Sequence, residues 1–312
     1  MKYCFGIDVG GTTVKLGLFD VEGNVLDKWE IPTRTDNNGE NVLPDIAQAI
    51  KDKMKERNLP KEEVAGAGIG VPGPVSSDGF INKAVNLGWK ERFNVEHKLS
   101  SLIDMPVKAG NDANVAALGE MWKGGGAGAE NVVFVTLGTG VGGGIIIGGK
   151  IVTGSHGAGG EIGHIHVEDQ ESDSCGCGNH GCLEQYASAT GVVRIANKLL
   201  AQTTQDSVLR SGEVSAKAVF DAVKAGDELA IKVAEQFGKY LGTALANISA
   251  IVDPEVFVIG GGVSKAGEVL LDYVKKYYVP TVFHGCRETR FELATLGNDA
   301  GIYGTARLIL DK

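Results

Sequence analysis

Three cysteines and a nearby histidine form a cluster that could bind a metal ion. Cys175, Cys177 and Cys182 fall within eight residues and are interleaved with glycines. Glycine permits the positive φ angles that a short loop needs to wrap around one ion. Three thiolates and one imidazole complete a tetrahedral zinc shell. The alternative is a set of reduced cysteines in a glycine-rich loop. The residues alone leave the fourth ligand open among three histidines, His164, His166 and His180.

The residues around this cluster carry the expected chemistry. A zinc ion with four protein ligands has no open coordination position, so we expect it to be structural. Acidic residues flank the loop at Glu161 and Glu184. The whole pattern reads Gly-Glu-x-Gly-His, ten residues, then Cys-x-Cys-Gly-x-x-Gly-Cys-x-Glu. It resembles the signature of the ROK family, which comprises repressors, open reading frames and kinases.

The resemblance implies a role for each residue of the pattern. It implies that zinc is bound by His164, Cys175, Cys177 and Cys182, and that a sugar is bound by Glu161, His164 and Glu184. His164 would then bind zinc through one ring nitrogen and sugar through the other, which would fix the orientation of the ring. The continuation from residue 185 to residue 191 is similar to that of the glucokinases in the family.

A carboxylate at the start of a helix is the candidate general base. A strand is expected to end at Asn111-Asp112, and a helix is expected from 113 to 122. Asp112 could serve only as the N-cap of that helix. A sugar hydroxyl is a poor nucleophile, and a carboxylate within reach can orient it and accept its proton. The block Gly-Asn-Asp-Ala-Asn resembles that of the ROK family, which implies Asp112 as the base and Asn111 as a sugar ligand.

A glycine turn between two expected strands, over 2–9 and 14–19, is the first candidate phosphate site. Backbone N–H groups of such a turn point at phosphate oxygens, and Asp8 could hold Mg²⁺ through water. An ordinary β-hairpin is the alternative. The segment resembles the first phosphate motif of the actin–hexokinase–heat-shock ATPases. This resemblance implies Mg-ATP contacts from Asp8, Gly10, Gly11, Thr12 and Thr13.

A second glycine turn follows an apolar strand at 131–137. Its residues contain the spacing G-x-G-x-x-G, but a dinucleotide-binding turn must open a helix. The β-branched run at 145–147 predicts a strand instead. We therefore expect a second strand–turn–strand that echoes the first, as in a duplicated ATPase core. The resemblance implies phosphate contacts from Thr136, Gly138, Thr139 and Gly140.

Other segments complete the expected ligand contacts. The turn Gly260-Gly261-Gly262 joins a strand to a helix and resembles the adenosine motif of the family, although any tight strand–helix turn favours glycine. The family also implies sugar contacts from Gly73, which lies between two prolines, and from Asn86. The alternative role of Asn86 is to bond its own loop backbone.

The composition excludes several classes of protein. The chain has 312 residues, a net charge of −9 and no basic run, which argues against nucleic acid or an anionic membrane as the main partner. No apolar stretch approaches the ~20 residues that span a bilayer. A strand pattern begins within the first six residues and leaves no room for a signal peptide. We therefore expect a cytoplasmic protein.

We predict an α/β fold with two domains of the actin/hexokinase-like (ribonuclease H-like) type and a cleft between them. The smaller domain is expected to cover 1–109 together with a C-terminal helix at 299–312, which should pack back on it. The larger domain, 110–298, contains the zinc loop, which runs from His164 to Cys182. Hinges are expected near Gly110 and Asn298. Asn94 is expected to cap a helix that ends at Ile103.

The resemblance implies transfer of the γ-phosphoryl group of ATP, with Mg²⁺, to the 6-hydroxyl of a hexose, with glucose expected. Alternatives are a kinase for N-acetylmannosamine, N-acetylglucosamine, mannose or fructose, and a sugar sensor without catalysis. Repressors of the family carry an N-terminal helix-turn-helix domain, whereas the phosphate hairpin here starts at residue 8. Polyphosphate is an alternative donor, but the Gly260–Gly262 turn favours ATP. The family also implies a homodimer or a larger homo-oligomer.

Overall fold

The computed structural model describes residues 1–311, which form two compact units. Helices and sheets are both present, so the α/β class is as predicted. Lys312, the last residue of the predicted 299–312 segment, lies outside the described residues. The first unit comprises Met1–Glu130, Gly144–Gly160 and the segment from Leu296 onward, and the second comprises Asn131–Gly143 and Glu161–Thr295.

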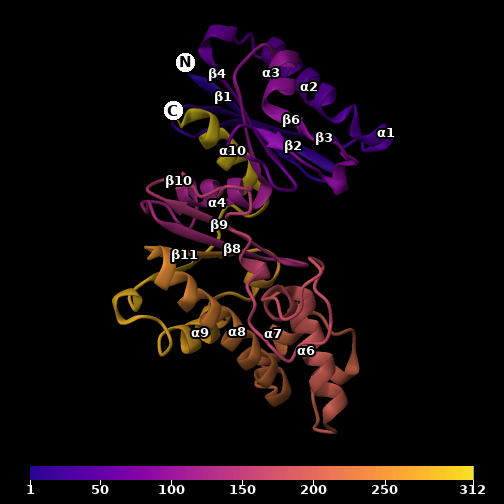
Figure 1. The fold of residues 1–312 in the computed structure, drawn as a ribbon, viewed down its shortest axis with the longest axis vertical. Helices are drawn as coiled ribbons and strands as arrows, with labels where there is room; N and C mark the ends of the chain where they lie inside the picture. Colours follow the sequence, from indigo (N-terminus) through magenta and orange to yellow (C-terminus); the bar gives the residue numbers. More distant parts are fainter. Residues whose placement is uncertain (312) are drawn as a thin grey trace. The chain divides into compact units, whose positions relative to one another are not determined.

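Five strands form the first sheet, in the order β3-β2-β1-β4-β7. Figure 1 labels the first four of them. They are β1 (Tyr3–Val9), β2 (Thr13–Asp20), β3 (Val25–Pro32), β4 (Val64–Val71) and β7 (Val107–Asn111). β1 pairs antiparallel with β2, whereas β1 with β4 and β4 with β7 are parallel pairs. The carboxyl ends of β1, β4 and β7 therefore meet at one edge of the sheet. The register Val71 to Asn111 places the start of the next helix at this edge.

Helices cover both faces of the first sheet. They are α2 (Val42–Glu56), α3 (Val95–Ile103) and α10 (Ala300–Leu310). Side chains alternate between the faces of a strand. Phe5 and Ile7 of β1 accordingly pack in the core shared with α2 and α3, whereas Cys4 packs with α10. As predicted, Asn94 caps α3, since its side chain accepts a hydrogen bond from the N–H of His97.

The helix that follows residue 111 belongs to the first unit. The helix α4 (Asp112–Lys123) packs against α10. Small residues allow this close approach, since a Cβ at Gly304 would lie 1.6 Å from the carbonyl oxygen of Val115. The chain therefore first leaves this unit after Glu130. The domain ranges 1–109 with 299–312, and 110–298, stay a prediction.

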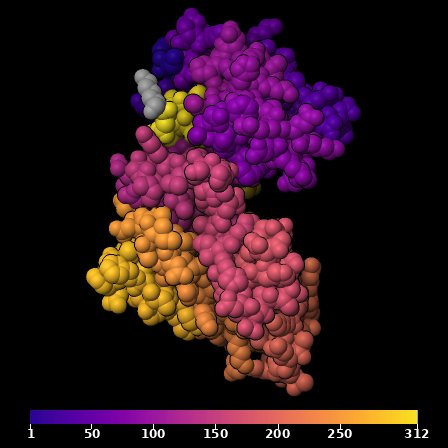
Figure 2. Space-filling model, viewed as in Figure 1, coloured from indigo at the N-terminus to yellow at the C-terminus, as the bar shows by residue number. Residues whose placement is uncertain are grey.

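The C-terminal helix α10 belongs to the first unit. α10 contacts β1, β2, β4 and β7 as well as α4. Figure 2 shows C-terminal residues, in yellow, against the purple residues of this unit. Thr305 of α10 is fully buried, and its hydroxyl oxygen accepts a 2.9 Å hydrogen bond from the N–H of Ile7 in β1. The C-terminal segment thus contributes a polar contact as well as apolar packing to the first sheet.

The second sheet repeats the strand order of the first. Its order is β10-β9-β8-β11-β12. The strands are β8 (Val132–Leu137), β9 (Val141–Ile147), β10 (Lys150–Ile151), β11 (Val256–Gly260) and β12 (Arg290–Leu293). In both sheets the first strand of a strand–turn–strand element pairs in parallel with a later strand, and that strand pairs in parallel with the last strand of the sheet. The expected duplicated core is therefore present as topology, and β9, not a helix, follows the glycine turn.

Helices after the zinc loop make up most of the second unit. They are α5 (Glu184–Ala187), α6 (Ala189–Gln202), α7 (Ala216–Lys224), α8 (Glu228–Val252) and α9 (Glu268–Tyr278). α8 packs against each of the other four. It ends at Asp253, which adopts a left-handed conformation before Pro254. Among the described residues, no helix has the length and apolar character needed to cross a membrane.

Three short elements complete the first unit. They are α1 (Asp36–Gly39), β5 (Phe80–Ile81) and β6 (Phe93–Asn94). β5 pairs antiparallel with β6 to form a small separate sheet. The N–H of the Trp89 indole donates to the carbonyl oxygen of Gly39, so the α1 segment is held against the loop that follows Asn86.

Candidate active site

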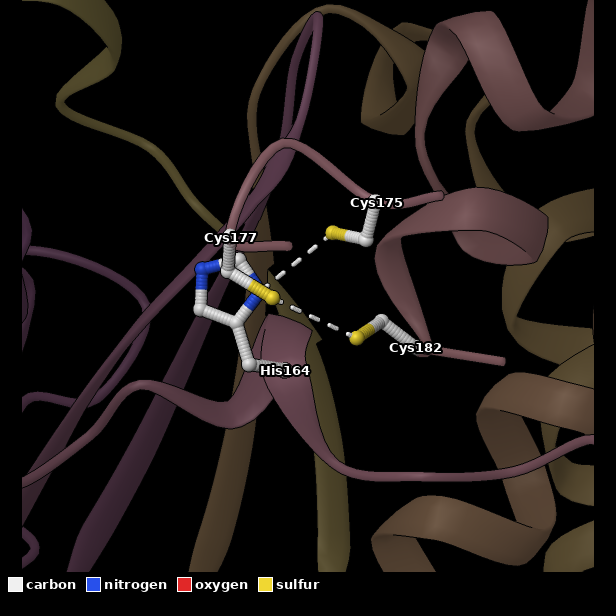
Figure 3. Close-up of side chains that lie close together, drawn as sticks. All are labelled: His164, Cys175, Cys177 and Cys182. Atoms are coloured by element: carbon white, nitrogen blue, oxygen red, sulfur yellow. Dashed lines mark hydrogen bonds between the residues drawn. The ribbon is translucent and has the colours of Figure 1, made fainter. Parts of the chain in front are cut away.

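The zinc loop brings together the four residues that the family resemblance implies as ligands. One ligand atom from each of His164, Cys175, Cys177 and Cys182 lies within 4.8 Å of all the others (Figure 3). His164 ends a short 3₁₀ helix, and the cysteines come from the loop before α5. Cys175 Sγ lies 3.7 Å from His164 Nδ1, and the Sγ atoms of Cys177 and Cys182 also lie 3.7 Å apart.

These distances fit a zinc ion. Zn–S bonds of about 2.3 Å in a tetrahedron place two sulfurs about 3.8 Å apart, which is close to the Cys177–Cys182 separation. The second ring nitrogen of His164 points away from the thiols in Figure 3. His166 does not join the cluster, because its ring nitrogens contact Asp169 and the carbonyl oxygen of His180. The cluster could therefore hold zinc with His164 as the fourth ligand.

The three thiols differ in the direction in which the protein shifts their pKa. Burial raises the pKa of Cys182 to about 12 and also raises the pKa of Cys175. The exposed Cys177 has a lowered pKa, chiefly because the backbone N–H of Asn179 stabilises its thiolate. Zinc binds thiolates, so loading of this cluster must release protons.

Glu184, the first residue of α5, links the zinc loop to the second glycine turn. Its Oε2 accepts a 3.0 Å hydrogen bond from the N–H of Val141, and its Oε1 lies 3.6 Å from Cys175 Sγ. The turn approaches this carboxylate closely, since a Cβ at Gly140 would lie 2.0 Å from Glu184 Oε2. The glycine is therefore needed for the observed position of Glu184. Glu161 is exposed, and its carbonyl oxygen accepts from the N–H of His164.

Residues at the start of α6 donate hydrogen bonds to the second glycine turn. Gly138 N–H donates to the carbonyl oxygen of Gly140, and the Gly138 carbonyl oxygen accepts from the N–H of Ala189. The hydroxyl of Thr190 donates to the Thr139 carbonyl oxygen at 2.8 Å. Thr139 is exposed, whereas Gly138 and Gly140 are half-buried. Sequence reasoning missed residues 189 and 190, because these contacts join positions about fifty residues apart, with no local pattern between them.

The third glycine turn lies beside the second. β11 and β8 are parallel, and Gly260 pairs with Thr136, so both turns begin at the same edge of the second sheet. Gly261 has φ of +85°, and a Cβ there would lie 2.5 Å from the backbone of Leu137. Nothing lies within 4 Å of a Cβ built at Gly262, which is exposed. This edge therefore presents backbone without side-chain obstruction, as a nucleotide site requires.

In the first unit, Asn111 and Asp112 lie at the edge of the first sheet where β7 meets α4. Asn111, not Asp112, is the N-cap, because Asn111 Oδ1 accepts from the N–H groups of Ala113 and Asn114. This replaces the alternative in which Asp112 serves only as the cap. Asp112 Oδ1 accepts from Ala113 N–H and from Asn111 Nδ2, at 2.8 and 2.9 Å.

The environment of Asp112 suits a base. The residue is accessible to solvent, yet the surrounding protein removes enough water to raise its pKa above the usual range. Hydrogen bonds from Ala113 N–H and the Asn111 amide oppose this shift, because they stabilise the carboxylate. A raised pKa makes a carboxylate a stronger proton acceptor.

The predicted sugar residues of the first unit border this edge. Asn111 Nδ2 donates to the carbonyl oxygen of Gly73 at 3.2 Å, and Gly73 has φ of +113°. Asn86 is exposed and lies beside the first glycine turn, where a Cβ at Gly11 would be 3.7 Å from the Asn86 carbonyl oxygen. Gly73 therefore lies near the candidate base, and Asn86 lies near the candidate phosphate turn.

The first glycine turn connects β1 to β2 as a hairpin. The N–H of Gly10 donates to the carbonyl oxygen of Thr13 at 3.0 Å, while Gly10, Gly11 and Thr12 are exposed. Asp8 is half-buried just before the turn, where Gly301 leaves room for its carboxylate.

The charge on Asp8 is sensitive to its neighbours. Burial, and secondly the negative charge of Asp112, raise the pKa of Asp8 to about 6, while Lys15 opposes the shift. Two carboxylates that disfavour each other's charge favour a nearby cation, so their oxygen donors suit Mg²⁺.

The predicted site residues thus fall into two sets. The first unit holds Asp8, Gly10, Gly11, Thr12, Thr13, Gly73, Asn86, Asn111 and Asp112. The second unit holds Thr136, Gly138, Thr139, Gly140, Glu161, His164, Cys175, Cys177, Cys182, Glu184, Gly260, Gly261 and Gly262. Within each unit, the expected phosphate and sugar residues border the same sheet edge or the same loop.

Known proteins resemble this chain in sequence and in structure. A glucokinase from Halalkalibacterium halodurans is 44% identical over 317 residues, which cover 99% of this chain and 95% of the relative. A ROK hexokinase from Thermus thermophilus superposes with a TM-score of 0.81 at 32% identity, covering 97% of this chain and 96% of the other. A ROK family glucokinase from Streptomyces griseus, solved with glucose and AMPPNP, superposes with a TM-score of 0.74 at 33% identity and 98% coverage of both chains.

The similarities extend along nearly the whole sequence. The fold of the chain is the actin/hexokinase-like fold of these solved structures. The model of the ROK family matches residues 4–312, a range that includes both glycine hairpins and the zinc loop. The chain belongs to the ROK family.

Proposed function

We propose that the chain transfers the γ-phosphoryl group of ATP to the 6-hydroxyl of glucose. Relatives and a solved neighbour with glucose and an ATP analogue support this activity. The observation that carries the chemistry is the position of Asp112. Its carboxylate lies at the sheet edge where Asn111 also contacts Gly73 and where the first glycine hairpin begins.

Asp112 would act as the general base. Its Oδ1 already accepts two hydrogen bonds, which hold the carboxylate in one orientation. Oδ2 is therefore the oxygen that would accept a hydrogen bond from the 6-hydroxyl, and then its proton. The sugar oxygen would attack the γ-phosphorus as the bond from that phosphorus to the β,γ-bridging oxygen breaks and ADP leaves. Correct orientation of the hydroxyl supplies most of the rate acceleration, because phosphoryl transfer requires little covalent chemistry from the protein.

The sugar would be held by polar side chains and one glycine. We assign this role to Gly73, Asn86, Asn111, Glu161, His164 and Glu184. Carboxylates accept strong charge-assisted hydrogen bonds from sugar hydroxyls. His164 would present its second ring nitrogen to the sugar, because Nδ1 faces the thiols. Zinc would be structural here and would fix the loop that carries His164 and precedes Glu184.

ATP would be bound by the three glycine turns and by Asp8. Backbone N–H groups of the first two turns, apart from those of Gly10 and Gly138, which bond within their own turns, would face the phosphates. Thr136 would lie beside them. Gly260–Gly262 would allow the adenosine to approach the backbone. Asp8 would hold Mg²⁺ through water, and Mg²⁺ supplies charge neutralisation at the phosphates when it is bound.

The cellular setting forms part of the same proposal. We expect a cytoplasmic enzyme that acts as a homodimer or a larger homo-oligomer, with neither nucleic acid nor membrane as a partner. The net charge of −9 supports the exclusion of nucleic acid, because that partner requires a basic surface.

The test is phosphorylation by the purified protein in Mg-ATP, measured against glucose, mannose, fructose and the N-acetylated hexosamines. The proposal expects the highest kcat/KM for glucose. A highest value for an N-acetylated hexosamine would keep the mechanism and replace the substrate. Sugar binding without turnover on any sugar would favour a sensor and would contradict the kinase assignment. Polyphosphate in place of ATP tests the choice of donor in the same assay.

A further inference from the structure

An arginine outside the predicted site connects the segment between two metal ligands to the helix that begins with Glu184. We propose that Arg194 is a positioning residue that holds the zinc loop and Glu184 in the geometry for sugar binding. The part of this inference that concerns sugar rests on the proposed function. The part that concerns the metal cluster stands on the contacts of the second unit alone.

The guanidinium of Arg194, on α6, contacts three different parts of the loop region. Its Nη2 lies 2.5 Å from Glu171 Oε2 and donates to the carbonyl oxygen of Gln185 at 3.1 Å. Its Nη1 lies 3.4 Å from Asp173 Oδ2. The planar fork of an arginine can serve several acceptors at fixed angles, which a lysine ammonium cannot do.

Glu171 is the buried partner in this network. Its side chain is 7% exposed, and the hydroxyl of Tyr186 donates to the same Oε2 at 2.5 Å. The Arg194 guanidinium lowers the pKa of Glu171 to about 2, so this carboxylate stays ionised at neutral pH. A buried carboxylate that loses its cation is costly, so the loop is strongly biased toward the position that keeps Arg194 in contact.

Gln185 connects Arg194 to the segment that carries the three cysteine ligands. Its Nε2 donates to the carbonyl oxygen of Asp173, two residues before Cys175, and its Oε1 accepts from the N–H of Cys182. The side chain of Gln185 thus joins the two ends of the cysteine segment. Its backbone carbonyl binds Arg194, and its neighbour along the chain is Glu184.

The opposite side of the loop is held to the core of the second unit. The hydroxyl of Tyr240, on α8, donates to Glu168 Oε2 at 2.7 Å. The rings of Tyr186 and Tyr240 are stacked with centroids 4.0 Å apart, and the Arg194 guanidinium lies 4.9 Å from the Tyr186 centroid. Between His164 and Cys175, the residues at positions 168, 171 and 173 are therefore held by side chains that are not metal ligands. This arrangement orients the ligands before zinc arrives.

The variant Arg194→Lys tests the proposal, because it keeps the charge and loses the fork. Partners that orient metal ligands contribute about 10- to 100-fold to metal affinity or activity. We expect zinc affinity, measured by competition with a chelator, to fall by about 10-fold or more. We expect KM for glucose to rise, while KM for ATP and kcat at saturating, zinc-replete conditions stay close to wild type.

Arg210→Lys is the matched control. Arg210 follows α6 and also serves three acceptors, the carbonyl oxygens of Leu200, Thr203 and Gln205, but it contacts no residue of the zinc loop. The Arg210→Lys substitution should leave zinc affinity unchanged. If the two variants lose zinc equally, the effect of Arg194 is general stabilisation, and the proposal is wrong.

A second variant keeps the test valid if Arg194→Lys does not fold. Glu171→Gln retains the shape of the buried side chain and removes the charge that Arg194 contacts. It should also lower zinc affinity and raise KM for glucose. Unchanged zinc affinity in either folded variant would overturn the proposal. Failure of wild-type protein to phosphorylate glucose would instead count against the proposed function, since chelator competition needs no substrate.

Discussion

Glu184 Oε2 accepts a 3.0 Å hydrogen bond from the N–H of Val141. This single carboxylate joins the helix that follows the zinc loop to the second glycine turn. Its other oxygen faces the thiol of Cys175. The proposed sugar ligand, the metal cluster and the proposed phosphate turn are therefore neighbours within the second unit, and a change in one should be measurable in the others.

The substitution Gly140→Ala tests this relationship. The added Cβ would lie 2.0 Å from Glu184 Oε2, so the carboxylate or the turn must shift. We expect KM for glucose to rise by about 10-fold, the effect of one lost hydrogen bond to a charged group. Steady-state kinetics with glucose varied at saturating ATP measures this change.

Gly212→Ala provides the control for that substitution. Nothing lies within 4 Å of a Cβ at Gly212, which is also in the second unit and has an extended backbone. Its kinetics should match wild type. A Gly140→Ala enzyme with unchanged KM for glucose would remove Glu184 from the sugar site.

The substitution Cys177→Ser should abolish stoichiometric zinc binding. Three thiolates and His164 form the proposed shell, and a serine hydroxyl is a poor zinc ligand. Loss of the metal should weaken glucose binding, because His164 and the loop before Glu184 lose their support. Metal analysis and glucose titration measure both effects. Purified wild-type protein that contains no zinc would disprove the structural metal.

The pH dependence of kcat/KM should report the carboxylate of Asp112 together with that of Asp8, whose pKa is raised to about 6. A general base works only as the carboxylate, so activity must rise as pH increases through its pKa. Protein surroundings raise that pKa above its ordinary value of 3.8, so the acid limb should lie above pH 3.8. Full activity maintained down to that pH would contradict the assignment. Zinc content must be measured at each pH, because acid also protonates the metal ligands.

The contact between Thr305 and β1 should contribute to the stability of the first unit. Thr305→Val keeps the shape and leaves the N–H of Ile7 without its 2.9 Å acceptor. An unsatisfied buried donor costs about 1–3 kcal/mol. Denaturant unfolding should show a loss of this size. Thr305→Ser retains the hydroxyl and should lose less, and equal losses in the two variants would exclude the hydrogen bond as the cause.

Local pattern predicts most of the fold. The apolar strands, the helical stripes and the β-branched run at 145–147 each indicate one element, and the structure contains each of them. The unit boundary follows less easily from sequence. Residues 112–130 stay with the first unit because α4 packs on α10, and nothing local relates helices so distant in the chain.

The candidate site was predictable where residue types define chemistry. Cysteine spacing and the Asn111-Asp112 pair indicate their positions directly, although Asn111, and not Asp112, caps the helix. The residues that orient these groups were not predictable. Val141 acts through its backbone, and Arg194 acts through a fold that brings α6 to the zinc loop. Neither role depends on a sequence pattern.

The most direct test of the account is a comparison of turnover and glucose binding in Asp112→Asn. The amide keeps the size of the side chain but cannot accept the proton. We predict that kcat falls by about 10²- to 10⁴-fold, the usual contribution of a general base. The Kd for glucose, measured by calorimetry, should stay close to wild type. Turnover near the wild-type rate in a variant that binds glucose normally would contradict the central claim.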